Sequence, residues 1–137
     1  MGVKSQVSVE YLVIISVAFL ILTPLIVYSY QLFIGYKDET KIALAKDLVK
    51  KVGEGADWVY SQGYPARMCL KVTVPEGVTE ASLLNKTVLL KIKTVAGETD
   101  IYHNTNAPLN GSLPVKAGVY KICLIAFPEY VNVSESV

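Results

Sequence analysis

The chain has little of the chemistry on which most enzymes depend. Only one of its 137 residues is histidine, His103, so a Ser-His or multi-histidine arrangement cannot be built. Asp100 lies three residues earlier, but a lone Asp and His on a strand usually provide only surface polarity. There is also no glycine-rich phosphate loop and no prominent pair of carboxylates. We therefore expect no catalytic activity and no cofactor.

An excess of charge of either sign is missing as well. Thirteen Lys and Arg residues against twelve Asp and Glu residues leave a formal net charge of +1. Proteins that bind nucleic acid usually carry a basic patch or stripe, so no nucleic-acid partner is expected. The two cysteines, Cys69 and Cys123, are too far apart for a metal-binding C-x-x-C motif, and no metal site is expected.

Charge disappears completely from one long segment. No charged residue lies between Glu10 and Lys37, and the interval consists almost entirely of Leu, Ile, Val, Phe, Tyr and small residues. A run of about 20 apolar residues is long enough to cross a bilayer as a helix. Residues 6–36 are therefore expected to form an apolar transmembrane helix.

The residues around this run help to distinguish between a secretory signal, a myristoylated N-terminus and a plain membrane anchor. A secretory signal needs an apolar stretch of roughly 7–15 residues and a small-residue cleavage site, whereas this run is longer and bulky residues follow it in "YSYQLFIGYKDE". N-myristoylation is disfavoured because Gln6 occupies the position of the required Ser or Thr. A plain anchor fits the length, with Lys4 and Lys37 giving only a weak orientation signal. It leaves Glu10 unexplained, because an acid at a membrane entrance is costly.

The string "KSQVSVEYL", residues 4–12, resembles the class III signal peptide of archaeal type IV pilin-like proteins, with its Q-x-S-x-E signature. The resemblance covers about six residues and the apolar run that follows. The residues that carry it are Lys4, Gln6, Ser8 and Glu10. It implies that a prepilin peptidase cuts between Ser5 and Gln6 and releases residues 1–5 as a leader. Ser5 stands where Gly or Ala is common in the family.

The same resemblance implies a fold and a function. The expected fold is an α+β, type IV pilin-like lollipop, in which a long N-terminal helix carries a small head. The expected function is that of a filament subunit for surface adhesion, assembled from identical or related subunits by a pilus machinery. The precursor would cross the cell membrane once with its head outside before it enters the extracellular filament. The alternative is a permanently anchored extracellular binding module, or a minor pilin that primes assembly.

Glu10 needs a physical reason for its position. A carboxylate in the first turn of a helix gains about 0.3–1 kcal/mol from the helix dipole, whereas burial of an unpaired charge costs several kcal/mol. Cleavage before Gln6 would create an α-amino group one turn away, in the same chain or in a neighbour. Pairing between neighbours would set the register of assembly, as single buried polar groups do in coiled coils. If Gln6 cyclises and loses its amine, Glu10 needs another donor, such as the Ser8 hydroxyl or Tyr11 of a neighbour. The alternative is that Glu10 lies at the level of the lipid headgroups without a partner.

The helix is expected to continue past the apolar run, from about Val7 to about Ser61. Over residues 37–63 the pattern becomes amphipathic, with apolar residues at alternating steps of three and four. These residues are Ile42, Ala45, Val49, Val52, Ala56 and Val59. Gly63 and Pro65 provide a stop signal. The stripe predicts that this half of the helix covers the head.

Residues 64–137 change to the period of two that is typical of strands. The strand candidates are "RMCLKVTV", "TVLLKIKT", "TDIYHN", "VYKICLIAF" and "YVNVS". Turn signals separate them at "PEG", "AGE", "NAPLNGS" and "KAG". Four to five antiparallel strands in one small sheet are marginal alone, so the sheet is expected to pack on the amphipathic helix.

The two cysteines lie in two of these strands. Each shares a strand face with a lysine, Lys71 or Lys121, so the thiols point the same way if the strands are neighbours. In an exported head this pattern predicts a Cys69–Cys123 disulfide. The alternative is a pair of free buried thiols.

Three N-x-S/T sequons lie in the head and none in the helix. Their asparagines are Asn85, Asn110 and Asn132. Such a group is expected in an exposed, glycosylated head. Asn110, in a loop with Gly and Pro, is the preferred candidate.

Overall fold

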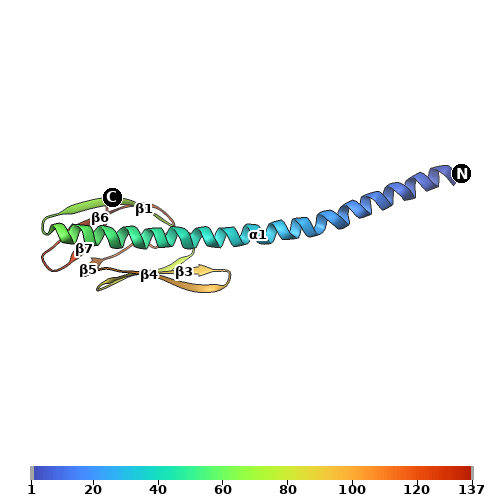
Figure 1. Ribbon diagram of the computed structural model, residues 1–137. Coiled ribbons are helices and arrows are strands. Elements are labelled where there is room, and N and C mark those ends of the chain that lie inside the picture. The colour runs from blue at the N-terminus through green and yellow to red at the C-terminus, as the bar shows by residue number, and fades with distance from the viewer. Residues whose placement is uncertain (1, 137) are drawn as a thin grey trace. The chain divides into compact units, whose positions relative to one another are not determined.

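The computed structural model describes residues 2–136 and consists of one helix followed by seven strands (Figure 1). The elements are α1 (Gly2–Gln62), β1 (Arg67–Val74), β2 (Val78–Leu84), β3 (Thr87–Thr94), β4 (Gly97–Asn104), β5 (Leu109–Gly111), β6 (Gly118–Ala126) and β7 (Val131–Ser136). The chain divides into two compact units, one ending at Lys37 and the other beginning at Asp38.

The long helix confirms the prediction from the apolar and amphipathic patterns. It begins at Gly2, a few residues before the expected start, and ends at Gln62, one residue after the expected end. Gly63 stops it with a φ of 78°, a left-handed conformation that costs glycine little. The Gly63 N–H donates to the carbonyl oxygens of Val59 at 3.2 Å and Tyr60 at 3.1 Å.

The strands require one correction to the expected fold. All five expected strands are present, but β2 and β5 were missed and the strands form two sheets instead of one. Their orders are β1-β6-β7-β5 and β2-β3-β4. The pairs are antiparallel except that β5 runs parallel to β7. The class is therefore α+β with one mixed and one antiparallel sheet.

Both missed strands have weak local signals. A register shift between Val78 and Glu80 interrupts the alternation of β2. β5 has only three residues and lies inside a segment rich in turn-forming residues. Its pairing depends on β7, which lies about twenty residues further along the chain, so no local pattern could have revealed it.

The core of the second unit lies between α1 and the inner faces of both sheets. The predicted helix stripe is confirmed from Ala45 onward: Ala45, Val52, Ala56 and Val59 are fully buried and Val49 nearly so. Ile42, the first residue of the predicted stripe, is only partly buried. The inner faces of β1 and β3 contribute the residues that alternation predicted. These include Val72, Val74, Val88, Leu90 and Ile92. A stripe on one helix thus joins two sheets into one core.

Carboxylates on the helix also hold loops of the second unit. Asp57 Oδ1 accepts hydrogen bonds from the backbone N–H groups of Asn106 at 2.8 Å and Ala107 at 3.1 Å. Asp38 Oδ2 accepts one from Val95 at 3.0 Å, in the turn between β3 and β4. Each carboxylate satisfies backbone donors that the strand ladders leave unpaired.

Candidate functional site

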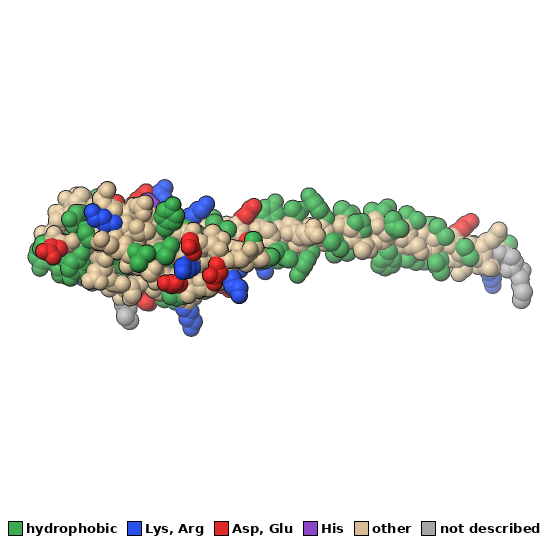
Figure 2. All heavy atoms as spheres, turned by 90° about the horizontal axis from the view of Figure 1, so that it is seen from below, with side chains coloured by type: hydrophobic (Ala, Val, Ile, Leu, Met, Phe, Trp, Pro, Cys, Tyr) green, Lys and Arg blue, Asp and Glu red, His purple; other side chains and the backbone are tan. Residues whose placement is uncertain are grey.

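The part of α1 before Asp38 is apolar on all sides and uncovered. Its large side chains are exposed, for example Leu20 at 76% and Phe33 at 58%. Among the described residues, α1 is the one helix long and apolar enough to cross a membrane. Figure 2 shows hydrophobic side chains along this part of the helix, whereas charged side chains gather over the second unit. The segment is compatible with membrane anchoring.

The hydroxyl groups of this segment are satisfied within the helix. Ser16, Thr23 and Ser29 each donate to the backbone carbonyl four residues earlier, at 2.7–2.8 Å. Such bonds let a polar side chain enter an apolar environment without an outside partner. Pro24 lies inside the helix, next to one of these serine or threonine bonds.

Glu10 differs from these hydroxyls. It is exposed, and its carboxylate makes no hydrogen bond or ion pair to any residue in the range 2–136. Gln6 lies one turn earlier, a rise of about 6 Å along the axis. Glu10 is the only acidic residue before Asp38. In an apolar environment the Glu10 carboxylate would therefore require a partner from outside the helix, whereas the hydroxyls of Ser16, Thr23 and Ser29 would not.

The residues of the predicted processing motif lie together at the start of α1. Lys4, Ser5, Gln6 and Ser8 are helical and exposed, whereas Met1 of the predicted leader lies outside the described residues. The first N–H groups of a helix have no intrahelical acceptor, so the first turn unwinds at low cost. The Ser5–Gln6 bond is thus at an accessible end of the helix.

Tyrosines flank the apolar run, a feature that the sequence patterns did not single out. Tyr11 lies near its start, and Tyr28, Tyr30 and Tyr36 lie near its end. Nineteen residues from Tyr11 to Tyr30 rise about 28 Å, close to the roughly 30 Å hydrocarbon thickness of a bilayer. Tyrosine is enriched at membrane interfaces, so this spacing is also compatible with membrane anchoring.

Two open grooves flank the helix of the second unit. The larger, about 590 Å³, lies between α1 and β4, with an apolar floor that includes Val49 and Ile101. The smaller, about 450 Å³, lies between α1 and β1 and is lined by Trp58, which is 54% exposed. The sequence patterns did not single out Trp58. Its position outside the predicted helix stripe was the signal that could have indicated an exposed aromatic side chain.

The lone histidine has a structural neighbour. A Cβ atom at Gly53 would overlap the His103 ring, so the missing side chain makes room for the imidazole against the helix. Asp100 lies three residues away on β4, where alternation places it on the opposite face, next to Lys91. The strand therefore does not bring His103 and Asp100 together. No group of three or more potential metal ligands occurs among residues 2–136.

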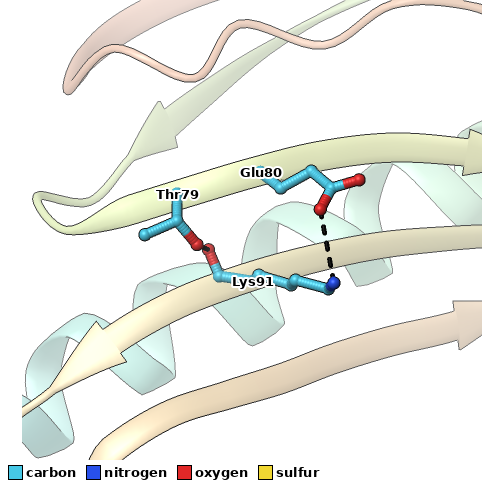
Figure 3. Close-up of polar contacts among 3 residues, drawn as sticks. All are labelled: Thr79, Glu80 and Lys91. Carbon is cyan, nitrogen blue, oxygen red and sulfur yellow. Dashed lines mark hydrogen bonds and ion pairs between the residues drawn. The ribbon is translucent and has the colours of Figure 1, made fainter.

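One cross-strand ion pair lies on the outer face of the β2-β3-β4 sheet. Lys91 Nζ is 3.3 Å from Glu80 Oε2, and the Thr79 hydroxyl donates to the Lys91 carbonyl at 3.4 Å (Figure 3). The Glu80 carboxylate, through its hydrogen bond and its charge, raises the pKa of the Lys91 ammonium above its ordinary value of 10.5. Asp100 and Glu98 on β4 raise this pKa further by their charge.

The predicted disulfide is present. Cys69 on β1 lies directly opposite Cys123 on β6, with Cα atoms 4.0 Å apart, and the two sulfur atoms are bonded. Lys71 and Lys121 form another directly opposed pair two residues away. The Arg67 guanidinium lies 3.7 Å from Cys123 Sγ. The alternative of two free thiols is thereby excluded.

The three sequons occupy different settings. Asn85 is exposed in the turn between β2 and β3, Asn110 is exposed on β5, and Asn132 is half-buried on β7. Asn110 and Asn132 lie directly opposite each other across the parallel strands.

Comparison of the chain with protein-family models, with curated proteins and with solved structures gave no match.

Proposed function

We propose that the protein is a structural subunit of an archaeal type IV pilus-like surface filament that serves adhesion. A prepilin peptidase cuts the membrane precursor between Ser5 and Gln6. The mature subunit then enters a helical polymer of identical or related subunits through residues 6–36. The observation that carries the proposal is an exposed apolar helix that directly follows the predicted recognition sequence of a prepilin peptidase.

The energetics of this transfer single out Glu10. Lipid tails are as apolar as leucine, so moving the helix from the bilayer into a bundle is not driven by the hydrophobic effect. Side-chain packing and polar pairing must supply the difference. Ser16, Thr23 and Ser29 are satisfied in both environments, whereas the carboxylate can pair with a neighbouring chain only on assembly. An α-amino group of Gln6 from a neighbour is the proposed partner.

The first experiment isolates surface filaments from the source cell and sequences the chain by mass spectrometry. The proposal requires this chain in high copy number, with Gln6 or its cyclised form as the first residue. Full-length chain found only in membranes would refute both cleavage and polymerisation.

The second experiment replaces Glu10 by alanine and compares it with Ser16→Ala. Glu10→Ala should leave cleavage intact and strongly reduce the amount of filament. Ser16→Ala removes a hydroxyl that is satisfied within the helix and should assemble normally. Normal filaments from the Glu10 variant would refute the register role while leaving the filament proposal open to the first experiment.

A second candidate is an extracellular binding module that stays anchored in the membrane. The groove of about 590 Å³ between α1 and β4 favours it, since ligand sites typically have volumes of about 300–1,000 Å³. This candidate predicts uncut chains in membranes and no incorporation into filaments. A minor pilin that primes assembly would instead be cut but present at a few copies per filament.

A further inference from the structure

We infer that Asn85 is the glycan acceptor of the folded head and that Asn110 and Asn132 remain unmodified. The inference requires only that the head is exported, a condition that the filament subunit and the anchored module share. It reverses the preference for Asn110 that the sequence alone suggested.

Asn85 lies in the turn between β2 and β3, where its side chain is exposed. Asn85 has a φ of 40°, and it is the only non-glycine residue with a positive φ in the range 2–136. Its carbonyl accepts a hydrogen bond from Leu109 N–H at 2.5 Å, and the Lys86 carbonyl accepts one from Thr105 N–H at 2.8 Å. These bonds hold the main chain of the turn from its inner side. The exposed side chain is therefore presented on a fixed support.

The Asn85 amide is also free to react. Its side chain makes no hydrogen bond to any residue that the structure describes, and Leu84 and Lys86 on either side are exposed as well. Thr87, which completes the sequon, donates its hydroxyl to Asn104 Oδ1 at 3.0 Å. That bond is exposed, so a transferase can replace it with one of its own at low cost.

The other two sequons are parts of a sheet. β7 is paired on both sides, by β6 and by β5, so drawing Asn132 into a transferase site would break two ladders. Asn110 Oδ1 accepts a hydrogen bond from Gly111 N–H at 2.8 Å, and Ser112 N–H donates to the Val133 carbonyl at 3.3 Å. The Asn110 sequon is thus engaged both by its own amide and by β7.

The position of these two asparagines also restricts modification. Directly opposed residues on neighbouring strands lie about 5 Å apart, and a glycan on Asn110 would stand over Asn132. Ile125 lies opposite Asn132 on its other side. At most one of the two side chains has room for a saccharide. Neither is presented by a turn, as Asn85 is.

The reaction is the ordinary transfer from a lipid-linked donor. Nδ2 of Asn85 forms a bond to the anomeric carbon of the saccharide. The bond from that carbon to the phosphate oxygen of the lipid carrier breaks, and the lipid phosphate leaves with the electron pair. One amide proton passes to a base of the transferase. The head supplies only the exposed amide and the Thr87 hydroxyl.

Tryptic digestion separates the three sites. The full chain, purified from the source cell, should give one sequon asparagine on each of the peptides 72–86, 94–116 and 122–137. We expect mass spectrometry to find the saccharide on 72–86 or on a longer peptide that includes it, and the other two peptides unmodified. A saccharide on 94–116 or 122–137, or an exported chain with no saccharide at all, would overturn the inference.

Variants test the same point independently. Asn85→Gln should reduce the mass of the intact chain to that of the bare polypeptide, whereas Asn110→Gln and Asn132→Gln should keep the full glycan mass. Thr87→Ala leaves Asn85 in place and should abolish modification, while Thr87→Ser should restore it. The Cys69–Cys123 disulfide, measured on the same samples, shows that each variant is folded. Loss of the glycan in Asn110→Gln with Asn85 intact would contradict the proposal.

Discussion

Asp57 connects the helix of the second unit to the loop between β4 and β5. One carboxylate oxygen accepts two backbone hydrogen bonds there, from Asn106 and Ala107. Hydrogen bonds to a charged acceptor are stronger than those between neutral groups. A backbone donor that loses its acceptor lowers the free energy of unfolding, because it is left unsatisfied in the folded chain. Asp57 thus holds this loop against the helix, while backbone bonds from Thr105 and Leu109 hold it against the turn between β2 and β3.

Asp57→Ala should lower the free energy of unfolding by about 1–3 kcal/mol, because two backbone donors lose their acceptor. Urea unfolding of the full chain in detergent micelles, followed by circular dichroism, measures the change. Asp57→Asn keeps an acceptor oxygen and should lose less. Asp47→Ala removes only an exposed ion pair to Lys51 and should cost about 0.5 kcal/mol or less. Equal losses in Asp57→Ala and Asp47→Ala would contradict the role of Asp57.

The pair of Lys91 and Glu80 gives a prediction about alkaline pH. Because the pKa of Lys91 is raised in the folded chain, its contribution to stability is complete below the ordinary lysine pKa of 10.5. The contribution disappears as the pH rises through the folded pKa. Glu80→Gln should therefore be less stable than the native chain at pH 7–9, with the difference shrinking above pH 10.5.

Thermal unfolding at a series of pH values measures this difference, and a side-chain NMR titration of Lys91 reports its pKa directly. Glu76→Gln removes an acid that is not among the causes of the Lys91 shift and serves as the control. An unchanged Lys91 pKa in Glu80→Gln would show that the ion pair is not formed in solution. The difference in stability should be small because both side chains are partly exposed.

At the scale of elements, glycines in the helix allow β-strands to approach it closely. Gly53 accommodates the ring of His103 on β4. Gly55 accommodates the side chains of Leu70 and Leu124, because a Cβ atom at Gly55 would lie only 2.7–2.9 Å from their methyl groups. An interior glycine costs a helix about 1 kcal/mol relative to alanine. The packing of both sheets on one helix compensates for that cost.

Gly53→Ala should destabilise the second unit, because the clash with His103 exceeds the gain in helix propensity. Overpacking of this kind typically costs about 1–3 kcal/mol. His103→Ala in the same background removes the clash, so the double variant should be more stable than Gly53→Ala alone. Gly35→Ala, with nothing near its Cβ position, should cause no loss of stability and can only gain the helix propensity of alanine, about 1 kcal/mol at most. Unfolding curves of the native chain, Gly53→Ala, His103→Ala and the double variant, compared as a double-mutant cycle, test this coupling. A double variant no more stable than Gly53→Ala would show that His103 is not the obstacle.

At the scale of the whole molecule, a disulfide joins strands that are far apart in sequence. Cys69 and Cys123 are separated by 54 residues, and the bridge encloses β2, β3, β4 and β5. A crosslink of this separation limits the unfolded chain far more than it limits the folded one. The two-sheet head therefore depends on the bridge in addition to its core.

Replacing both cysteines by serine should lower the free energy of unfolding by about 4 kcal/mol in the chain-entropy model. Urea unfolding of the native chain and of the double serine variant measures the loss. The native chain with a reductant should approach the variant, and the variant itself should not respond to the reductant. A native chain whose stability is unaffected by complete reduction would contradict the prediction.

The sequence by itself determined the features that depend on local pattern. The period of 3.6 over residues 42–59 predicted the buried stripe, the period of two predicted β1 and β3 at their observed bounds, and Gly63 predicted the helix end. The apolar run and the predicted processing motif are likewise read from consecutive residues.

Only the tertiary structure decided which strands pair and in which direction. The short strand β5 exists because β7 lies beside it, and two sheets form because one helix stripe covers both inner faces. The settings of the three sequons follow from the same pairings, since a turn exposes Asn85 while β5 and β7 hold the other two. Such contacts join residues far apart in the chain, and their free energy appears only when the core has formed. Local periodicity in the sequence therefore does not predict these long-range contacts.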